Sequence, residues 1–229
     1  MARGRVHMPV ADVTIDQVWL PNPPAGTLVC GGFDGSENDD WSAIKLETAD
    51  GLIFTPRYGP DKRPTIWNPA EWGGRTPRGE IHAAWDELAR TYKLHRVYCD
   101  TGFRDESSYE TEIETWAQKH GEKVFISWQM SGGTRVNAVY AALRRFESDL
   151  AQGAITQDGC PITATHMGNA RKIAKTADRY GLGKPSQKQK IDVAVTSLLA
   201  HEAASDARAE GWAKVRTNFI YTSSSTRRR

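Results

Sequence analysis

Apolar runs and alternating patterns predict three strands near the start of the chain. The run TLVCGGFD at 27–34 has the apolar content of a buried strand. The segments DWSAIKLET at 40–48 and LIFTPRY at 52–58 flank the dipeptide Asp50-Gly51, which favours a hairpin turn. We therefore expect the fold to open with three consecutive strands.

Helical patterns then alternate with short strands. Apolar residues recur at helical spacing within 79–92 and again from Tyr109 to a predicted helix end near Gly121. Each of these helices leads into a predicted strand, LHRVYCD at 94–100 and KVFISW at 123–128.

The rest of the chain is mainly helical. Val139, Leu143, Phe146 and Leu150 share one helical face, and the short segments GAIT and PITATH lead from there into NARKIAKTADRYG. The last long helix is predicted over 191–212. This order of elements predicts an α/β fold with a mixed sheet of five or slightly more strands, flanked by helices.

The length of 229 residues suits one domain with loose ends. We expect an extended, proline-rich arm or linker at 1–26, the folded domain at 27–212 and a flexible basic tail at 213–229. No apolar run approaches the roughly 20 residues that span a bilayer, and the N-terminus lacks a secretory signal pattern. We therefore expect a location in the cytoplasm, without membrane insertion.

Three cysteines fit a reducing compartment. Cys30, Cys99 and Cys160 are odd in number and lack the paired spacing of zinc ligands. We expect all three to be buried, reduced thiols.

Charge is unevenly distributed although the net charge is only +2. Between Asp34 and Asp50 there are six acidic residues and one basic residue. Between His166 and Asp192 there are seven basic residues and two acidic residues. Carboxylates that hold cations beside Lys and Arg that hold phosphates would suit a metal site acting on a polyanion. Two unrelated solvated surfaces are the alternative interpretation.

Three aspartates stand where the predicted elements converge. Asp34 ends the first strand, Asp100 ends the fourth, and Asp192 begins the last helix. In an RNase H-like sheet the first and fourth strands are neighbours, roughly 4.8 Å apart, so their terminal carboxylates could share a cation. A helix N-terminus favours the third, ionised carboxylate. Taken singly, each residue could instead belong to a turn or a helix cap.

The sequence resembles the nuclease domains of tailed-phage large terminase subunits. The resemblance spans residues 27–212 and is carried by four stretches, namely GGFDGSENDDWSAI, HRVYCD, THMGNARKIAK and KIDVAVTSLLAHEA. It implies an RNase H-like endonuclease that cuts double-stranded viral DNA concatemers during genome packaging. It also implies that Asp34, Asp100 and Asp192 are catalytic and bind two Mg²⁺ or Mn²⁺ ions.

The same resemblance implies partners in the cytoplasm of a bacterial host. These are double-stranded DNA, an ATPase motor domain, a portal and a small terminase subunit. The chain contains no G-x-x-x-x-G-K-[ST] phosphate loop, so we expect no ATP hydrolysis. We expect the motor to be an excised domain, with a separate chain as the alternative.

Several basic residues near the predicted site are candidate phosphate contacts, against the alternative that they are only solvated. They are Lys184, Lys188, Lys190, Arg171 and Lys172.

Other polar and aromatic residues have simpler explanations. Asp39 and Asp40 lie in a predicted turn, and Glu80 is an acid in a first helical turn. His166 without a ligand partner favours a structural role over acid catalysis, and Trp72 is a loop residue that could touch substrate.

Three other functions are possible interpretations of the sequence. The string Asp100-Thr101-Gly102 matches aspartic proteases, but those enzymes are almost wholly β and need a second such loop, which this chain lacks. A junction resolvase or a nuclease for RNA:DNA hybrids would share the fold. A domain that binds DNA or a packaging partner without cutting is the third alternative.

Overall fold

The fold is built on a mixed sheet. The computed structural model describes residues 18–36, 39–101 and 108–213. Seven strands form the main sheet in the order β8-β7-β1-β2-β3-β9, with β6 also paired to β2. Their bounds are β1 Leu28–Asp34, β2 Ser42–Thr48, β3 Leu52–Phe54, β6 Ile66–Trp67, β7 Lys93–Asp100, β8 Phe125–Ser127 and β9 Thr156–Gln157. The predicted mixed α/β sheet is confirmed, and it is larger than five strands.

Pairing within the sheet follows the predicted order. β1 pairs antiparallel with β2 and parallel with β7, and β8 runs parallel to β7. The predicted turn joins β2 to β3, where Gly51 has a φ of 90° that side-chain-bearing residues rarely adopt. The second hairpin strand is shorter than predicted. Pro56 has no N–H for the ladder, and the chain continues instead into the small hairpin of β4 Arg57–Tyr58 and β5 Arg63–Pro64.

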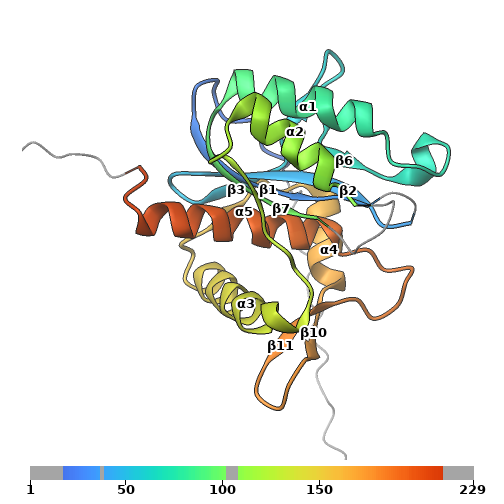
Figure 1. Cartoon of the computed structure of the whole chain (residues 1–229), viewed down its shortest axis with the longest axis vertical. Helices are drawn as coiled ribbons and strands as arrows, with labels where there is room; N and C mark the ends of the chain where they lie inside the picture. The colour runs from blue at the N-terminus through green and yellow to red at the C-terminus, as the bar shows by residue number, and fades with distance from the viewer. Residues whose placement is uncertain (1–17, 37–38, 102–107, 214–229) are drawn as a thin grey trace, which may run out of the picture.

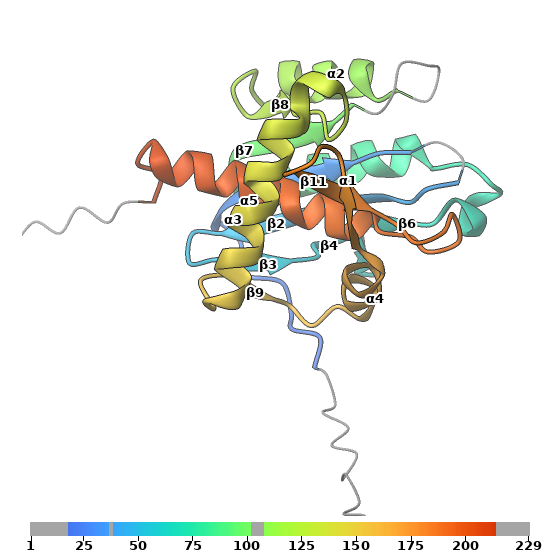
Figure 2. The ribbon, with the colours of Figure 1, turned by 90° about the horizontal axis from the view of Figure 1, so that it is seen from below.

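Helices cover both faces of the sheet (Figure 1). They are α1 Arg78–Thr91, α2 Glu110–His120, α3 Val136–Ala151, α4 Pro161–Asn169 and α5 Asp192–Ala209. α1 and α2 lie on one face, where Phe33 of β1 packs edge-on against Trp116 with 5.0 Å between ring centroids. α5 lies on the other face, and α3 crosses it from outside (Figure 2). The sheet is thus the middle of a layered core.

The close packing of α5 on β1 depends on a glycine. A Cβ atom at Gly32 would lie 2.3 Å from the carbonyl oxygen of Thr196 and 2.5 Å from the nitrogen of Ala200. The helix contributes small side chains to this contact, including Ala200 and Ala203, which are fully buried. The helix backbone therefore lies directly on the strand, and this fixes where α5 begins relative to the end of β1.

Three elements, in two segments of the chain, lacked a prediction of their type. PITATH belongs to α4, and residues 171–183 form a two-stranded hairpin of β10 Arg171–Ala174 and β11 Tyr180–Gly183. Two short 3-10 helices, η1 Pro69–Trp72 and η2 Gly133–Arg135, complete the described elements.

Part of the predicted arm lies against the domain. The amide of Leu20 donates to the carbonyl of Asp158 at 2.8 Å, and the amide of Gly26 donates to the carbonyl of Thr91 at 2.7 Å. The boundaries of arm, domain and tail stay predictions, because 1–17 and 214–229 lie outside the described residues.

The three cysteines are reduced in the structure. Cys30, Cys99 and Cys160 are buried and form no disulfide, as predicted. Within the described segments, no helix is both long and apolar enough to cross a membrane.

Candidate active site

Two of the predicted aspartates face each other across neighbouring strands. Asp34 is the last residue of β1 and Asp100 is the last residue of β7. The parallel register of these strands pairs the two residues directly. Both are partly buried. The expected adjacency of the first and fourth predicted strands, and of their terminal carboxylates, is therefore confirmed.

The third aspartate comes from the opposite layer. Asp192 is the first residue of α5 and is 7% exposed. Its Oδ2 atom is buried and has no hydrogen-bond partner among the described residues. Burying a charged oxygen without a partner is costly, so the position favours a bound cation or a bound proton.

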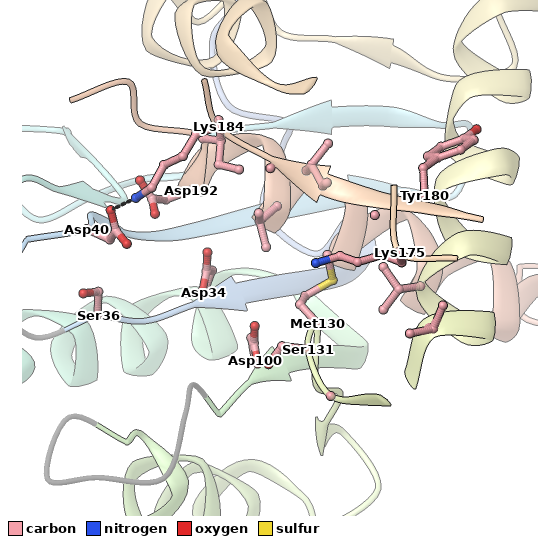
Figure 3. A pocket seen from close by; sticks show the side chains of 18 of the residues that line it. Asp34, Ser36, Asp40, Asp100, Met130, Ser131, Lys175, Tyr180, Lys184 and Asp192 are labelled. Atoms are coloured by element: carbon pink, nitrogen blue, oxygen red, sulfur yellow. Dashed lines mark hydrogen bonds and ion pairs between the residues drawn. The ribbon is translucent and has the colours of Figure 1, made fainter. Parts of the chain in front are cut away.

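These side chains surround a common cavity of about 700 Å³. Four carboxylates line it, those of Asp34, Asp40, Asp100 and Asp192, and Figure 3 places them around one space at the ends of the strands. The β10–β11 hairpin and the loop after β8 form the opposite wall. The cavity is therefore acidic on the side of the sheet and of α5.

Crowding of the acids shifts their protonation. Burial raises the pKa of Asp34 well above its ordinary value, and the charges of Asp100, Asp192 and Asp40 raise it further. Burial, followed by the charge of Asp40, raises the pKa of Asp192 to about 6. The site therefore holds negative charge poorly when no cation lies between the carboxylates.

Asp40 belongs to this site and is more than a turn residue. Its Oδ1 atom accepts hydrogen bonds from the Nζ atoms of Lys184 at 2.5 Å and Lys190 at 2.9 Å. Burial opposes ionisation of Asp40, but these two bonds bring its pKa below the ordinary value. Asp39 is exposed and accepts only from Lys190, at 2.8 Å, among the described residues. The acidic run after Asp34 was the sequence signal for Asp40.

The predicted phosphate contacts divide into three groups. Lys184 and Lys190 bind Asp40, whereas Lys188 is exposed on the loop before α5. Arg171 and Lys172 lie on β10, where the Nζ atom of Lys172 is 2.9 Å from Glu147. Their role as phosphate contacts stays a prediction.

Lys175 was missing from the predicted contacts. It is exposed, follows β10 and lines the cavity, where Figure 3 places its side chain opposite the carboxylates. A Cβ atom at Gly181 would lie 2.8 Å from the Cε atom of Lys175. The glycine therefore leaves room for the lysine stem. The basic run around Lys175 was the available sequence signal.

The other candidates lie elsewhere. Glu80 accepts a hydrogen bond from the Tyr58 hydroxyl at 2.9 Å and is not part of the cavity lining. Trp72 lines a separate cavity of about 410 Å³ beside Arg63. His166 is 2% exposed and packs against Trp41, in agreement with a structural role.

The donor set suits a hard divalent cation, because carboxylate oxygens are the ligands that such cations prefer. Among the described residues, however, no three acidic, histidine or cysteine side chains stand close enough together to enclose one ion. The partnerless Oδ2 atom of Asp192 is the feature that best fits a cation.

The sequence is similar to proteins of two Mycobacterium phages. No protein-family model matches the sequence. The gene 13 proteins of Mycobacterium phages D29 and L5 are 28% and 26% identical to it over 193 residues, which are 79% of this chain. The match covers 30% of each relative, so the chain spans less than a third of their length.

Solved structures identify the fold. The large terminase nuclease from thermophilic phage G20c, with bound magnesium, matches this chain with a TM-score of 0.54 at 15% identity. The match covers 81% of this chain and 92% of the G20c chain. The large terminase of bacteriophage HK97 has a TM-score of 0.55 at 13% identity, over 82% of this chain and 41% of that protein. This chain therefore has the RNase H-like fold of the nuclease domains of bacteriophage large terminases.

Proposed function

We propose that the chain is a divalent-metal-dependent endonuclease that cuts double-stranded DNA during phage genome packaging. The observation that carries this proposal is the in-register pairing of Asp34 with Asp100 at the ends of β1 and β7. The buried Asp192 on the same cavity supports it. So does the likeness in fold to the G20c nuclease, which has been solved with magnesium and with cobalt.

In this proposal the three aspartates hold two Mg²⁺ or Mn²⁺ ions. Asp34 and Asp100 offer oxygens from the sheet, while Asp192 offers the Oδ2 atom that has no protein donor among the described residues. Bound ions would lower the pKa of a water ligand and so supply the nucleophile for phosphodiester hydrolysis. Asp40 adds a fourth carboxylate to the cavity, and its lysine partners hold it ionised.

DNA would approach along the basic hairpin wall. Lys175 and Lys188 are exposed and are the proposed phosphate contacts, together with Lys184, Lys190, Arg171 and Lys172. We expect contacts mainly to phosphates and weak sequence preference. An ATPase motor, a portal and a small terminase subunit are proposed partners in the host cytoplasm.

Plasmid cleavage tests this function. Supercoiled DNA should be nicked, linearised or degraded with Mg²⁺ or Mn²⁺ and stay intact in EDTA, because the carboxylates need a cation to activate water. Asp34→Ala, Asp100→Ala and Asp192→Ala should each lose most of this activity. Asp39→Ala is the matched control, since its exposed carboxylate is outside the cavity lining, and its effect should be mild. Cutting that continues in EDTA, or a fully active Asp100→Ala variant, would contradict the mechanism.

Experiments on the same purified protein distinguish the other candidate functions. Binding of duplex DNA without cutting in Mn²⁺ would favour a non-cutting DNA-binding domain. If four-way junctions or RNA:DNA hybrids outcompete duplex DNA as substrates, a junction resolvase or hybrid nuclease would replace the packaging nuclease.

A further inference from the structure

His166 has a buried role beside the proposed metal site. The imidazole sits near the end of α4, and its Nδ1 atom accepts a hydrogen bond from the backbone N–H of Val193 at 3.2 Å. Val193 directly follows Asp192 in the first turn of α5. The first four N–H groups of a helix have no partner within the helix, and Ile191, at the N-cap, has no polar side chain to accept one. His166 therefore caps α5 from a distant part of the chain.

The same end of α4 holds both flanks of Asp192. The Asn169 side chain donates to the carbonyl oxygen of Lys190 at 2.9 Å, two residues before Asp192. The ring of Trp41 lies 5.0 Å from the His166 ring between centroids. The backbone is thus hydrogen-bonded by α4 side chains two residues before the aspartate and directly after it.

A hydrogen bond from a buried lysine on β2 also joins α4 to the sheet. The Nζ atom of Lys45 on β2 is fully buried and donates to the hydroxyls of Thr55 at 2.8 Å and Thr163 at 3.0 Å. Thr163 lies one helical turn before His166 on α4. A hydrogen-bonded route therefore runs from the sheet through α4 to the first turn of α5.

We propose that His166 is a positioning residue that fixes the orientation of the Asp192 carboxylate by capping the first turn of α5. This inference rests on the proposed function, because the orientation matters only if Asp192 holds a cation. Loss of the cap leaves the buried N–H of Val193 without its acceptor and loosens the turn that carries Asp192. Residues that orient metal ligands in this way typically change metal affinity by about 10- to 100-fold when they are lost.

Mn²⁺ binding to the purified chain, measured by calorimetry, tests the proposal without relying on activity. His166→Phe keeps a ring against Trp41 but removes the acceptor, and it should weaken Mn²⁺ binding about tenfold or more. His166→Asn loses the ring but places an amide oxygen close to the former Nδ1 position, so it should recover most of the affinity. If the Phe variant does not fold, His166→Gln replaces it, because its oxygen lies beyond the Nδ1 position.

A second histidine provides the matched control. The Nδ1 atom of His82 also accepts a hydrogen bond, a partly buried one from the Trp116 indole at 2.9 Å, but on the face of the sheet opposite α5. His82→Phe should leave Mn²⁺ affinity unchanged. In an Asp192→Asn background, His166→Phe should cause little further loss, because the two changes act through one carboxylate.

The outcomes separate this inference from the proposed function. Wild type that does not bind Mn²⁺ would overturn the proposed function and this inference with it. Wild type that binds Mn²⁺ while His166→Phe binds it equally well would overturn only the positioning role. Equal losses in the Phe and Asn variants, in step with their melting temperatures, would also overturn it, because the acceptor atom would then not matter.

Discussion

Burial and neighbouring charges make ionisation of Asp34 and Asp192 unfavourable in the folded protein. Asp192 is almost fully buried, and its raised pKa of about 6 means that its charged form destabilises the folded state near neutral pH. The penalty is fully present above the folded pKa. It shrinks progressively as the pH falls from about 6 towards the ordinary value of 3.8, because over this range the folded protein binds the proton more tightly than the unfolded chain does.

Asp192→Asn should therefore unfold no more easily than wild type at pH 7.5 in EDTA. A pKa change from 3.8 to about 6 corresponds to at most roughly 3 kcal/mol of unfolding free energy, and lost hydrogen bonds will reduce the gain. The advantage over wild type should shrink when the denaturant titration is repeated at pH 5. Asp178→Asn, at an exposed carboxylate on the β10–β11 hairpin, is the control and should show no such gain.

Added Mn²⁺ should reverse this order. A ligand that binds only the folded state raises the melting temperature of the wild type, and Asp192→Asn should lose most of that response. If both proteins shift equally on adding Mn²⁺, Asp192 is not a metal ligand.

At the scale of the elements, the site depends on how closely α5 lies on β1. Gly32→Ala would force a Cβ atom to within 2.3 Å of a helix carbonyl, so the helix must move or the chain must unfold. Overpacking of this kind typically costs about 1–3 kcal/mol or more. We expect a clearly lower denaturation midpoint and weaker Mn²⁺ binding, because α5 carries Asp192.

The same substitution at Gly79 is the matched control. Gly79 lies in α1 with open space around its Cβ position, so Ala should be neutral or stabilise the helix by up to about 1 kcal/mol. Equal stability of Gly32→Ala and wild type would mean that α5 does not press on β1 as closely as described.

Elements with a clear apolar pattern could be predicted from the sequence. β1 is a largely buried apolar run, and β7 ends in the buried run of residues 97–99. Each strand then ends in aspartate, so both the strands and their terminal acids were visible. α4 lacked such a pattern, since the residues it buries most are Thr163 and His166. All four residues of β10 are exposed, so no alternation of apolar and polar positions marked it as a strand.

The part of the site that the sequence did not predict depends on contacts between residues that are far apart in the sequence. Asp40 reads as a turn residue because its neighbours are polar, and its partners Lys184 and Lys190 are far away in sequence. The cap from His166 to Val193 likewise joins two segments that no local pattern links. Only the packing of α4 and of the loop before α5 brings these groups together.

At the scale of the whole molecule, the acidic cavity faces a basic wall. The carboxylates come from the sheet and from α5, while the opposing hairpin carries the exposed Lys175. Lys184 and Lys190 already neutralise Asp40, so they have less positive charge to offer to DNA than lysines without a carboxylate partner. Lys175 and Lys188 should therefore contribute most of the phosphate binding on this side.

DNA binding in EDTA, followed by fluorescence anisotropy over a range of salt concentrations, tests this assignment. Each phosphate contact releases counterions and adds about 0.9 to the slope of log affinity against log salt. The Lys175→Ala, Lys188→Ala double variant should therefore bind more weakly, with a slope smaller by up to about 2. Mn²⁺ affinity should persist, since neither lysine contacts the aspartates among the described interactions. Lys93→Ala is the matched control, because this exposed lysine begins the strand that ends at Asp100, and its slope should equal that of wild type. An unchanged slope in the double variant would remove the hairpin wall from the DNA path, and DNA would then have to reach the carboxylates from another side of the cavity.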